Sequence, residues 1–540
     1  MSVPAGRNLP RPVVMQSLER RTLLSSYFVS PSGSDSGPGT SAAPWKTLQH
    51  AADEVVAGDT VTVRSGAYTG FVLGWDGPQN GTANAPITFK ADAGATISAR
   101  NNKTADGINL EGADYVIVDG FTVIPAGGQD AWRAGIRSVQ NSHAILRNNT
   151  VQMRTNDRYG IFSSFTDHLL VADNNVSGTN NSGIYTSNSA VNPTIRGNTV
   201  HHVGGNGLHF NGDISQGGSG VITGALVEQN VVYDAGGAVG GSAINMDGVQ
   251  DSTIQNNLLY DNHAKGIALY QIDAAEGSTG NLVRHNTVVQ ADDATGYALT
   301  IKDASTGNQV FNNILLSLNT FNGAINLSTD SESGFVSDYN IVTDRLSTTD
   351  GDSFMSLPNW RGQMSQDAHS KLADPASLFA DLTGRDLRLK SGSVAIDAAD
   401  ARHAVGSDIT GATRPSGSGY DIGAYEFAAV SSVKPPAPTK MKARSAGATS
   451  VALTWIDNAI NESGYLIRAK PGPRGAWFTV ARRGVNTTSF TAKNLINGVK
   501  YYFIVRAFNA AGSSAYAPMT SATPALTKPA DIASVAKLIF

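Results

Sequence analysis

The chain has 540 residues, more than one ordinary core can hold, which favours two or more domains. Only 16% of the residues are charged and the formal net charge is −4; this gives no basic field, and no cluster of Lys and Arg is interleaved with aromatic residues, which predicts no nucleic-acid partner. The sequence has no cysteine, which excludes disulfides and thiolate metal sites, and no run of 18 apolar residues, so no membrane span is expected.

Residues 1–26 are interpreted as a leader associated with export. Positions 18–25 read Leu-Glu-Arg-Arg-Thr-Leu-Leu-Ser, which resembles a segment common near the start of bacterial surface and exported proteins. The leader lacks the apolar core of an ordinary signal peptide. We therefore expect a secreted or cell-surface protein, with a disordered cytosolic leader as the alternative.

From residue 27 the pattern changes to short strands and turns. Residues 45–52 carry apolar side chains at helical spacing and predict one short amphipathic helix. Such a helix would shield the apolar end of a stack of β-strands. The stretch from Tyr27 to Tyr68, which includes Gly-Asp-Thr-Val-Thr-Val at 58–63, resembles the opening of bacterial right-handed parallel β-helix proteins.

An asparagine followed by a short apolar run returns eight times between residues 149 and 341. The steps are 26, 23, 32, 27, 29, 27 and 27 residues. A fixed motif at a varying period predicts a stacked solenoid with constant strands and variable loops. We interpret the asparagine as a turn residue whose amide bonds its equivalents one coil above and below, about 4.8 Å away. The eight are Asn149, Asn175, Asn198, Asn230, Asn257, Asn286, Asn313 and Asn340.

Each repeat also contains a Gly or Ala, then an apolar residue, then alternation, as in Gly183-Ile184-Tyr185. Alternation of period two places Ile and Leu inside and the intervening residues outside. Two regular strands per coil and a third, less regular one describe a parallel β-helix over residues 27–430. The repeat fades beyond about residue 345, and we interpret the charged segment at 386–427 as a structural cap that closes the C-terminal end.

Residues 431–438 contain Pro-Pro-Ala-Pro and form a stiff linker by composition. Short alternating strands follow over residues 439–524. They resemble a fibronectin type III domain, with Trp455 as its buried tryptophan and Tyr501 as its corner tyrosine, which implies a spacer or contact surface. Residues 525–540 are expected to be a disordered tail. The predicted fold class is all-β, a right-handed parallel β-helix solenoid followed by a small β-sandwich.

Outward residues of stacked coils form columns along the solenoid. On the second strand of each coil, two columns collect aromatic rings, a histidine, amides, a carboxylate and an amine. Aromatic platforms beside fixed amides and carboxylates suit carbohydrates, whereas a polar sheet without function is the alternative. The residues predicted to bind substrate are Tyr185, Asn211, Asn245, Tyr270 and Arg137, and those predicted to be catalytic are Lys302, His209, Asp247 and Asp213.

Two reactions fit this face. In β-elimination on a uronic-acid polysaccharide, Lys302 or His209 would take the proton α to the carboxylate. The resulting negative charge would be neutralised by Arg137, by Arg284 or by Ca²⁺. The hard oxygen ligands considered for Ca²⁺ are Asp213, Asp247 and Asn245. Hydrolysis instead needs two carboxylates about 5 to 9.5 Å apart, for which Asp213 and Asp247 on adjacent coils are the candidates.

The β-helix proteins that this chain resembles include polysaccharide lyases and glycoside hydrolases of pectin- and alginate-type substrates. The resemblance implies an extracellular polysaccharide as the partner, with β-elimination slightly favoured over hydrolysis. A non-catalytic cell-surface glycan adhesin is the other alternative, because fold does not fix function. No cofactor is assigned, with Ca²⁺ as the candidate, and a capped solenoid is expected to be a monomer.

Overall fold

The computed structural model describes residues 25–77, 79–128, 130–427 and 433–525. The chain divides into two compact units, residues 1–427 and 428–540. Nearly all of the expected leader and tail lies outside the described residues. Within the described part, no helix is both long and apolar enough to cross a membrane.

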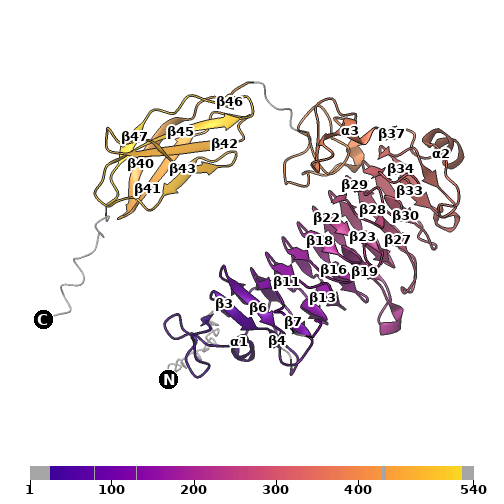
Figure 1. Cartoon of the computed structure of the whole chain (residues 1–540), viewed down its shortest axis with the longest axis horizontal. Coiled ribbons are helices and arrows are strands. Elements are labelled where there is room, and N and C mark those ends of the chain that lie inside the picture. The colour runs from indigo at the N-terminus through magenta and orange to yellow at the C-terminus, as the bar shows by residue number, and fades with distance from the viewer. Residues whose placement is uncertain (1–24, 78, 129, 428–432, 526–540) are drawn as a thin grey trace, which may run out of the picture. The chain divides into compact units, whose positions relative to one another are not determined.

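The first unit is a stack of coils, and each regular coil gives one strand to each of three parallel sheets (Figure 1). Sheet 1 contains β1 (Ser26–Val29), β2 (Thr60–Val63), β5 (Ile87–Ala91), β8 (Val116–Asp119), β11 (Ile145–Arg147), β14 (Leu170–Ala172), β17 (Thr194–Arg196), β21 (Leu226–Glu228), β25 (Thr253–Gln255), β28 (Leu282–Arg284), β31 (Gln309–Phe311) and β34 (Val336–Asp338). Sheet 2 contains β4 (Phe71–Leu73), β7 (Asp106–Glu111), β10 (Ala134–Val139), β13 (Tyr159–Ser164), β16 (Ser182–Ser187), β19 (Leu208–Asn211), β23 (Ser242–Asp247), β27 (Lys265–Tyr270), β30 (Leu299–Ile301), β33 (Ile325–Leu327) and β36 (Leu346–Ser347). Sheet 3 contains β3 (Gly66–Thr69), β6 (Ala95–Ala99), β9 (Thr122–Val123), β12 (Thr150–Gln152), β15 (Asn175–Ser177), β18 (Thr199–Val203), β22 (Val231–Ala235), β26 (Leu258–Tyr260), β29 (Thr287–Gln290), β32 (Ile314–Ser317), β35 (Ile341–Val342) and β37 (Lys371–Leu372).

Inward side chains of all three sheets form one continuous apolar core along the stack. The anchors of sheet 2, such as Ile184 and Ile244, are 2% and 0% exposed, as the alternation predicted. Two more strands, β20 (Ile222–Thr223) and β24 (Val249–Gln250), pair in the turns that follow sheet 2. The fold class predicted from the sequence is confirmed for this unit.

The repeated asparagine stands at the turn between sheets 1 and 3 and forms a buried ladder. Asn257 is typical: its Nδ2 donates to Asn286 Oδ1 at 2.9 Å and to the Val227 carbonyl at 2.9 Å. Its Oδ1 accepts the backbone N–H and the Nδ2 of Asn230, both at 3.0 Å. The ladder uses the amide hydrogen bonds that the repeat predicted, and no amide atom is left over for a ligand.

One member of the predicted ladder is wrong by a single position. Asn149 bonds to Asn174, not to Asn175, which is exposed at the start of β15. Asp173, just before it, has a φ of 56°, the left-handed conformation found before other ladder members such as Asn257, where Asn256 has a φ of 54°. The asparagine that follows the left-handed residue is the one whose side chain turns inward.

Helices cover both ends of the stack (Figure 1). At the N-terminal end, α1 (Leu48–Glu54) starts at Thr47, whose side chain accepts the His50 N–H, and buries Leu48 and Ala51. At the C-terminal end, α2 (Leu357–Met364) places Trp360 in the same core with no exposed surface. The sequence predicted the first helix but not the second.

The segment after β37 was expected to close the C-terminal end and instead lies along the flank of the solenoid. It includes α3 (Pro375–Leu378), the hairpin of β38 (Phe379–Asp381) and β39 (Asp386–Leu389), and the short 3-10 helix η3 (Ala401–His403). Phe379 and Leu387 pack against Leu258 and Ile314, the outward apolar residues of sheet 3. Its position is explained by these outward residues, which would otherwise expose apolar surface.

The second unit is an antiparallel sandwich. One sheet contains β40 (Thr439–Gly447), β41 (Ser450–Ile456) and β44 (Ser489–Ala492). The other, which we call the module sheet, contains β43 (Phe478–Arg483), β42 (Gly464–Pro471), β45 (Tyr501–Asn509), β46 (Gly512–Ser513) and β47 (Thr520–Ala522). Trp455 and Tyr501 lie in its core, and the Tyr501 hydroxyl accepts the Ile496 N–H at 3.3 Å, as a corner tyrosine would.

Candidate functional site

Sheet 2 stacks its outward side chains in the register expected from the sequence. Backbone pairing places His209 beside Asn245 and Asn211 beside Asp247. On the next strand, Asp247 pairs with Tyr270. Residues almost a hundred positions apart in the sequence therefore become neighbours on one outer face.

These columns line a groove of about 470 Å³, which we call the sheet 2 groove. Loops on two sides form its walls, one before β23 and one after β27. Six of the predicted site residues line it, together with several that the sequence did not single out. The lining residues are Asn181, Gly205, Asn206, His209, Asn211, Val239, Gly240, Gly241, Asn245, Asp247, Lys265, Ala268, Tyr270, Ile272, Asp273, Thr300 and Lys302.

Three of the predicted site residues do not line the groove. Arg137 lies three strands from His209 along sheet 2, where it forms an ion pair with Glu111 and bonds to Asn109. The Asp213 carboxylate accepts the Ser215 N–H at 3.1 Å and caps the 3-10 helix η1 (Ile214–Gln216). The third residue, Tyr185, is buried one coil below the groove.

His209 lines one end of the groove and stacks on Tyr185 of the neighbouring coil. Their rings are stacked with centroids 4.2 Å apart, and the Tyr185 hydroxyl accepts a hydrogen bond from Asn211 Nδ2 at 3.2 Å. His209 Nδ1 is 3.2 Å from Ser182 Oγ. Burial lowers the pKa of His209 to about 3, so the imidazole is neutral at ordinary pH and does not supply positive charge.

Asp247 holds the wall of the groove in place. Its carboxylate accepts the backbone N–H groups of Ile272 and Asp273, both at 2.8 Å, and of Ala274 at 3.4 Å. Burial raises the pKa of Asp247, although these three N–H groups act in the opposite direction. The residue is 1% exposed, so it fixes the loop after β27 and presents little surface to a ligand.

Two lysines from neighbouring strands enter the groove. Lys265 begins β27, and Lys302 follows β30, the next strand of sheet 2. Burial lowers the pKa of Lys265, and the nearby positive charge of Lys302 lowers it further. Lys302 Nζ lies 3.4 Å from the Asp303 carboxylate and keeps a third of its side chain exposed. The groove therefore holds one lysine whose pKa is lowered and a second that lies beside a carboxylate.

Lys265 was missed because strict alternation fails where each coil bends. Counting back from the buried Ile267 by twos would place Gly266 outside and Lys265 inside. A Cβ on Gly266 would instead point inward and lie 2.6 Å from Val288 Cγ1 in the core. Glycine at this bend turns inward and leaves the residue before it outside. The Gly or Ala repeated before each anchor is the signal that could have revealed this third outward column.

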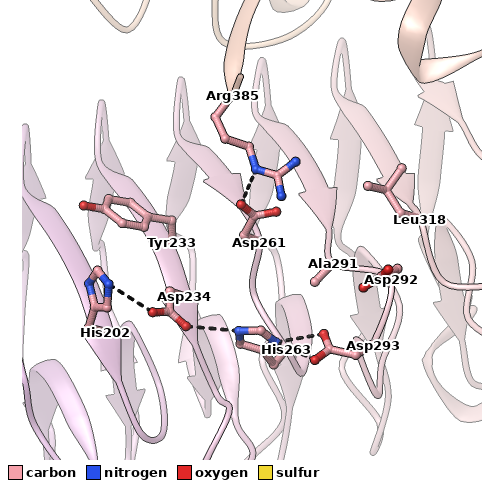
Figure 2. Close-up of a pocket in the computed structure, with 10 residues that line it drawn as sticks. All are labelled: His202, Tyr233, Asp234, Asp261, His263, Ala291, Asp292, Asp293, Leu318 and Arg385. Carbon is pink, nitrogen blue, oxygen red and sulfur yellow. Dashed lines mark hydrogen bonds and ion pairs between the residues drawn. The ribbon is translucent and has the colours of Figure 1, made fainter. Parts of the chain in front are cut away.

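A second pocket, of about 570 Å³, lies on the outer side of sheet 3 (Figure 2). Its centre is a chain of alternating rings and carboxylates: His202 Nε2 is 3.3 Å from Asp234, which is 3.0 Å from His263 Nε2, and His263 Nδ1 is 2.8 Å from Asp293. Arg385, from the flanking segment, forms an ion pair with Asp261 at its edge. Alternation along the strands does not predict this cluster, because His202 and Asp234 have left-handed backbone conformations near the ends of β18 and β22. The other two partners, His263 and Asp293, lie in the turns after β26 and β29.

The side chains of the second pocket already bind one another. Both ring nitrogens of His263 and both oxygens of Asp234 have partners. Burial lowers the pKa of His263, but its hydrogen bonds to Asp293 and Asp234 outweigh this and raise the pKa overall. The sheet 2 groove, whose lysines are not neutralised to this degree, is the better candidate for a reacting site.

The residues considered as Ca²⁺ ligands do not fit that role. The oxygens of Asp247 are bonded to backbone N–H groups, the Asp213 carboxylate caps η1, and Asn245 Oδ1 accepts the Tyr270 hydroxyl at 2.8 Å. In the parts of the chain that the structure describes, no three or more His, Cys, Asp or Glu side chains are placed to hold a metal ion.

Three family models match the chain. Residues 27–176 match a Pel9A-like right-handed β-helix region, residues 159–339 match a right-handed β-helix region, and residues 436–523 match a fibronectin type III domain. Over residues 27–339 the chain is thus similar to Pel9A-like right-handed β-helices, and it carries a C-terminal fibronectin type III domain, as its sequence predicted.

The chain is also similar to two curated relatives and to a solved structure. The chain is 36% identical over 84 residues to pectate lyase PEL9 of Emericella nidulans, which covers 16% of this chain and 20% of that protein. It is 28% identical over 134 residues to the uncharacterized protein YwoF of Bacillus subtilis, covering 23% and 28%. The chain thus spans less than a third of either relative. Pectate lyase Pel9A, 17% identical, superposes with a TM-score of 0.50 over 74% of this chain and 96% of its own, which shows a shared fold.

Proposed function

We propose that this protein acts outside the cell, secreted or at the cell surface, and cleaves a uronic-acid polysaccharide by β-elimination in the sheet 2 groove. The observation that carries the proposal is that Lys265, at the start of β27, and Lys302, just after β30, line the same groove. The names of the similar pectate lyases support the choice of reaction. The fold alone does not decide it.

In this mechanism Lys265 is the base. Its unprotonated Nζ takes the proton α to the substrate carboxylate, and the C–H electron pair forms the new C=C bond while the glycosidic C–O bond breaks. The leaving oxygen keeps the electron pair of that bond and takes up a proton. The ammonium of Lys302 stabilises the negative charge that develops on the carboxylate.

The remaining groove residues position the sugar. Tyr270 donates to Asn245 and so fixes the orientation of that amide, while Asp247 holds the wall formed by residues 272–274. Amides fixed in this way can donate to and accept from sugar hydroxyls. His209 contributes a neutral ring at one end of the groove and is not the base in this proposal, whereas Lys302 keeps a catalytic role.

Two alternatives are less well supported. Hydrolysis by Asp213 and Asp247 would require carboxylates that are free to exchange protons with substrate, but one caps a helix and the other binds three N–H groups. A non-catalytic adhesin would use the same groove for binding. It would leave unexplained why Lys265, whose pKa is lowered, lies near a second lysine, Lys302.

The test is incubation of the purified chain with polygalacturonate, alginate and a neutral galactan. Elimination produces an unsaturated product with new ultraviolet absorbance, whereas hydrolysis produces reducing ends without it. Lys265→Met is expected to lower the rate about 10²- to 10⁴-fold. The matched control is Lys90→Met on β5, an exposed lysine on sheet 1, which should retain full activity. Binding of a polyuronate without any cleavage would leave the adhesin alternative.

A further inference from the structure

The C-terminal module carries a charge opposite to that of the β-helix. Residues 436–523 contain 11 Lys or Arg and 2 Asp or Glu, whereas residues 1–427 contain 26 Lys or Arg and 41 Asp or Glu. The formal charge is therefore +9 for the module and −15 for residues 1–427. The net charge of the whole chain hides this difference, so the expectation that the protein has no basic field is wrong for the module.

The cations gather on the outer face of the module sheet. Tyr465, Ile467 and Ala469 of β42 point into the core, which leaves Arg468 and Lys470 outside. The same alternation on β45 leaves Tyr502, Ile504, Arg506 and Phe508 outside. Arg482 of β43 joins this face because it pairs with Leu466, which in turn pairs with Arg506. Outward neighbours lie about 7 Å apart along a strand and about 5 Å apart across strands.

Aromatic rings lie between these cations. Lys470 Nζ is 5.1 Å from the Trp477 ring centroid and 5.7 Å from that of Tyr502, over which Lys500 also lies at 5.6 Å. Two further pairs of the same kind are Arg482 over Phe508 at 5.1 Å and Arg506 over Tyr516 at 4.8 Å. The sequence analysis found no such interleaving because the residues come from three strands and the adjoining loops.

In the described part of the chain, no carboxylate forms an ion pair with the cations of this face. Among the residues that the structure describes, none of these Lys and Arg side chains forms a salt bridge, although 17 salt bridges are found in the β-helix unit. The Nε atoms of Arg468 and Arg506 are buried and have no hydrogen-bond partner. Uncompensated guanidinium groups held against aromatic rings are suited to bind an anionic polymer.

We propose that the outer face of the module sheet is a second binding site, which takes an anionic polysaccharide of the polyuronate class. Carboxylates spaced along the polymer would meet the rows of Arg and Lys, and sugar rings would lie against Trp477 and Tyr502. The choice of a polyuronate among anionic polymers rests on the function proposed for the sheet 2 groove; the existence of an anion-binding face does not. The module would thereby hold the polymer that the acidic β-helix unit, by its charge, tends to repel.

The experiment measures binding to polygalacturonate and alginate by affinity gel electrophoresis and calorimetry. All proteins are full chains that carry Lys265→Met, so that no polymer is consumed. The face variant combines Lys470→Gln, Arg482→Gln and Arg506→Gln. The control variant combines Lys440→Gln, Lys442→Gln and Arg444→Gln, which removes the same charge from the exposed face of β40 in the other sheet. Neutral galactan and a single-stranded DNA oligonucleotide are measured in parallel.

We expect the face variant to bind polyuronate at least about tenfold more weakly and the control variant less than about twofold. Equal losses in both would show general charge attraction and overturn the site. Tighter binding of DNA than of polyuronate would assign the face to nucleic acid instead, and self-association abolished by the face variant would assign it to the acidic unit of a second copy. If the triple variant unfolds, the single variant Arg482→Gln, at an exposed position, replaces it in the same binding measurement.

The outcome is separable from that of the proposed function. Cleavage is measured on chains with Lys265 intact, and binding on chains without it. Absence of ultraviolet product from a chain that binds polyuronate would refute elimination only. Unchanged polyuronate binding by the face variant, while chains with Lys265 intact still cleave, would refute the module site only.

Discussion

Two sets of polar residues run along the same solenoid and behave in opposite ways. The asparagine ladder between sheets 1 and 3 repeats one residue type at every coil, and its members, such as Asn257, are fully buried with each amide hydrogen-bonded. The outward columns of sheet 2 change residue type from coil to coil, from His209 to Asn245 and from Asp247 to Tyr270. The backbone is equally regular in both.

The difference shows how structural and functional residues can be told apart in a repeat. A residue type recurs because each coil offers it the same turn and the same hydrogen-bonding groups. Its partners are therefore the equivalent residues of the coils above and below. A position that varies on a regular backbone is free of that constraint. Variation that places Lys265 and Lys302 in one groove is therefore the basis of the proposed site, whereas repetition of Asn indicates a turn.

The largest effect is expected at Lys302. Lys302→Gln removes the charge that would stabilise the developing carboxylate anion, and we expect kcat to fall about 10²- to 10³-fold. A change at an outward position should leave the thermal unfolding temperature within a few degrees of the parent. Steady-state kinetics and thermal unfolding of the same preparation check both statements.

The pH profile of this variant adds an independent readout. A base acts when it is unprotonated, so activity of the parent rises with pH as Lys265 loses its proton, below the range of an ordinary lysine because its pKa is lowered. Removing the Lys302 charge raises that pKa, which shifts the rise in activity to higher pH. An unshifted profile would contradict the assignment of Lys265 as the base.

The ladder should respond in the opposite manner. Asn257→Ala leaves the Asn230 N–H and the Val227 carbonyl buried without partners, which we expect to lower the free energy of unfolding by about 2 to 4 kcal/mol. Activity per folded molecule at low temperature should not change. Denaturant unfolding and kinetics provide the measurement.

Asn175→Ala is the matched control for the ladder. Asn175 carries the same side chain but is exposed and bonds only to the His201 ring, so its loss should change the stability by less than about 0.5 kcal/mol. A large effect at Asn175 and a small one at Asn174 would restore the ladder that the sequence predicted.

How much could be predicted depended on where the backbone stays regular. Alternation placed His209, Asn245, Asp247 and Tyr270 in their columns because two-residue periodicity holds through the middle of each strand. It failed for Lys265, where glycine bends the coil. The cap α2 and the flanking segment were also misjudged, because they depend on which apolar residues of the last coils need cover, and no local period encodes that.

Asp247 is expected to hold the wall of the groove, and a conservative variant tests this role. Asp247→Asn keeps the shape of the side chain but exchanges one acceptor oxygen for a donor, so the loop at residues 272–274 loses at least one N–H bond. We expect KM to rise roughly tenfold with kcat less affected, because the wall of the groove moves while the lysines stay. A loss in kcat with KM unchanged would instead show that the carboxylate takes part in the reaction.

The smallest effect concerns the second pocket and its stability at different pH. Because the pKa of His263 is raised in the folded state by Asp293 and Asp234, its contribution to stability is fully present below the unfolded pKa and is lost as the pH rises through the folded pKa. The ring is about 29% exposed, so the contribution is expected to stay below about 1 kcal/mol. The difference between the unfolding free energies of the parent and of His263→Gln, measured from pH 5.5 to 8.5, isolates this contribution of His263. Asp293→Asn, which removes one of its two partners, should reduce the contribution in part. If the stability of the parent and of His263→Gln changes with pH in the same way, the rings and carboxylates in Figure 2 do not bind the proton more tightly in the folded protein. The preference for the sheet 2 groove over the second pocket would then rest on the lysines alone.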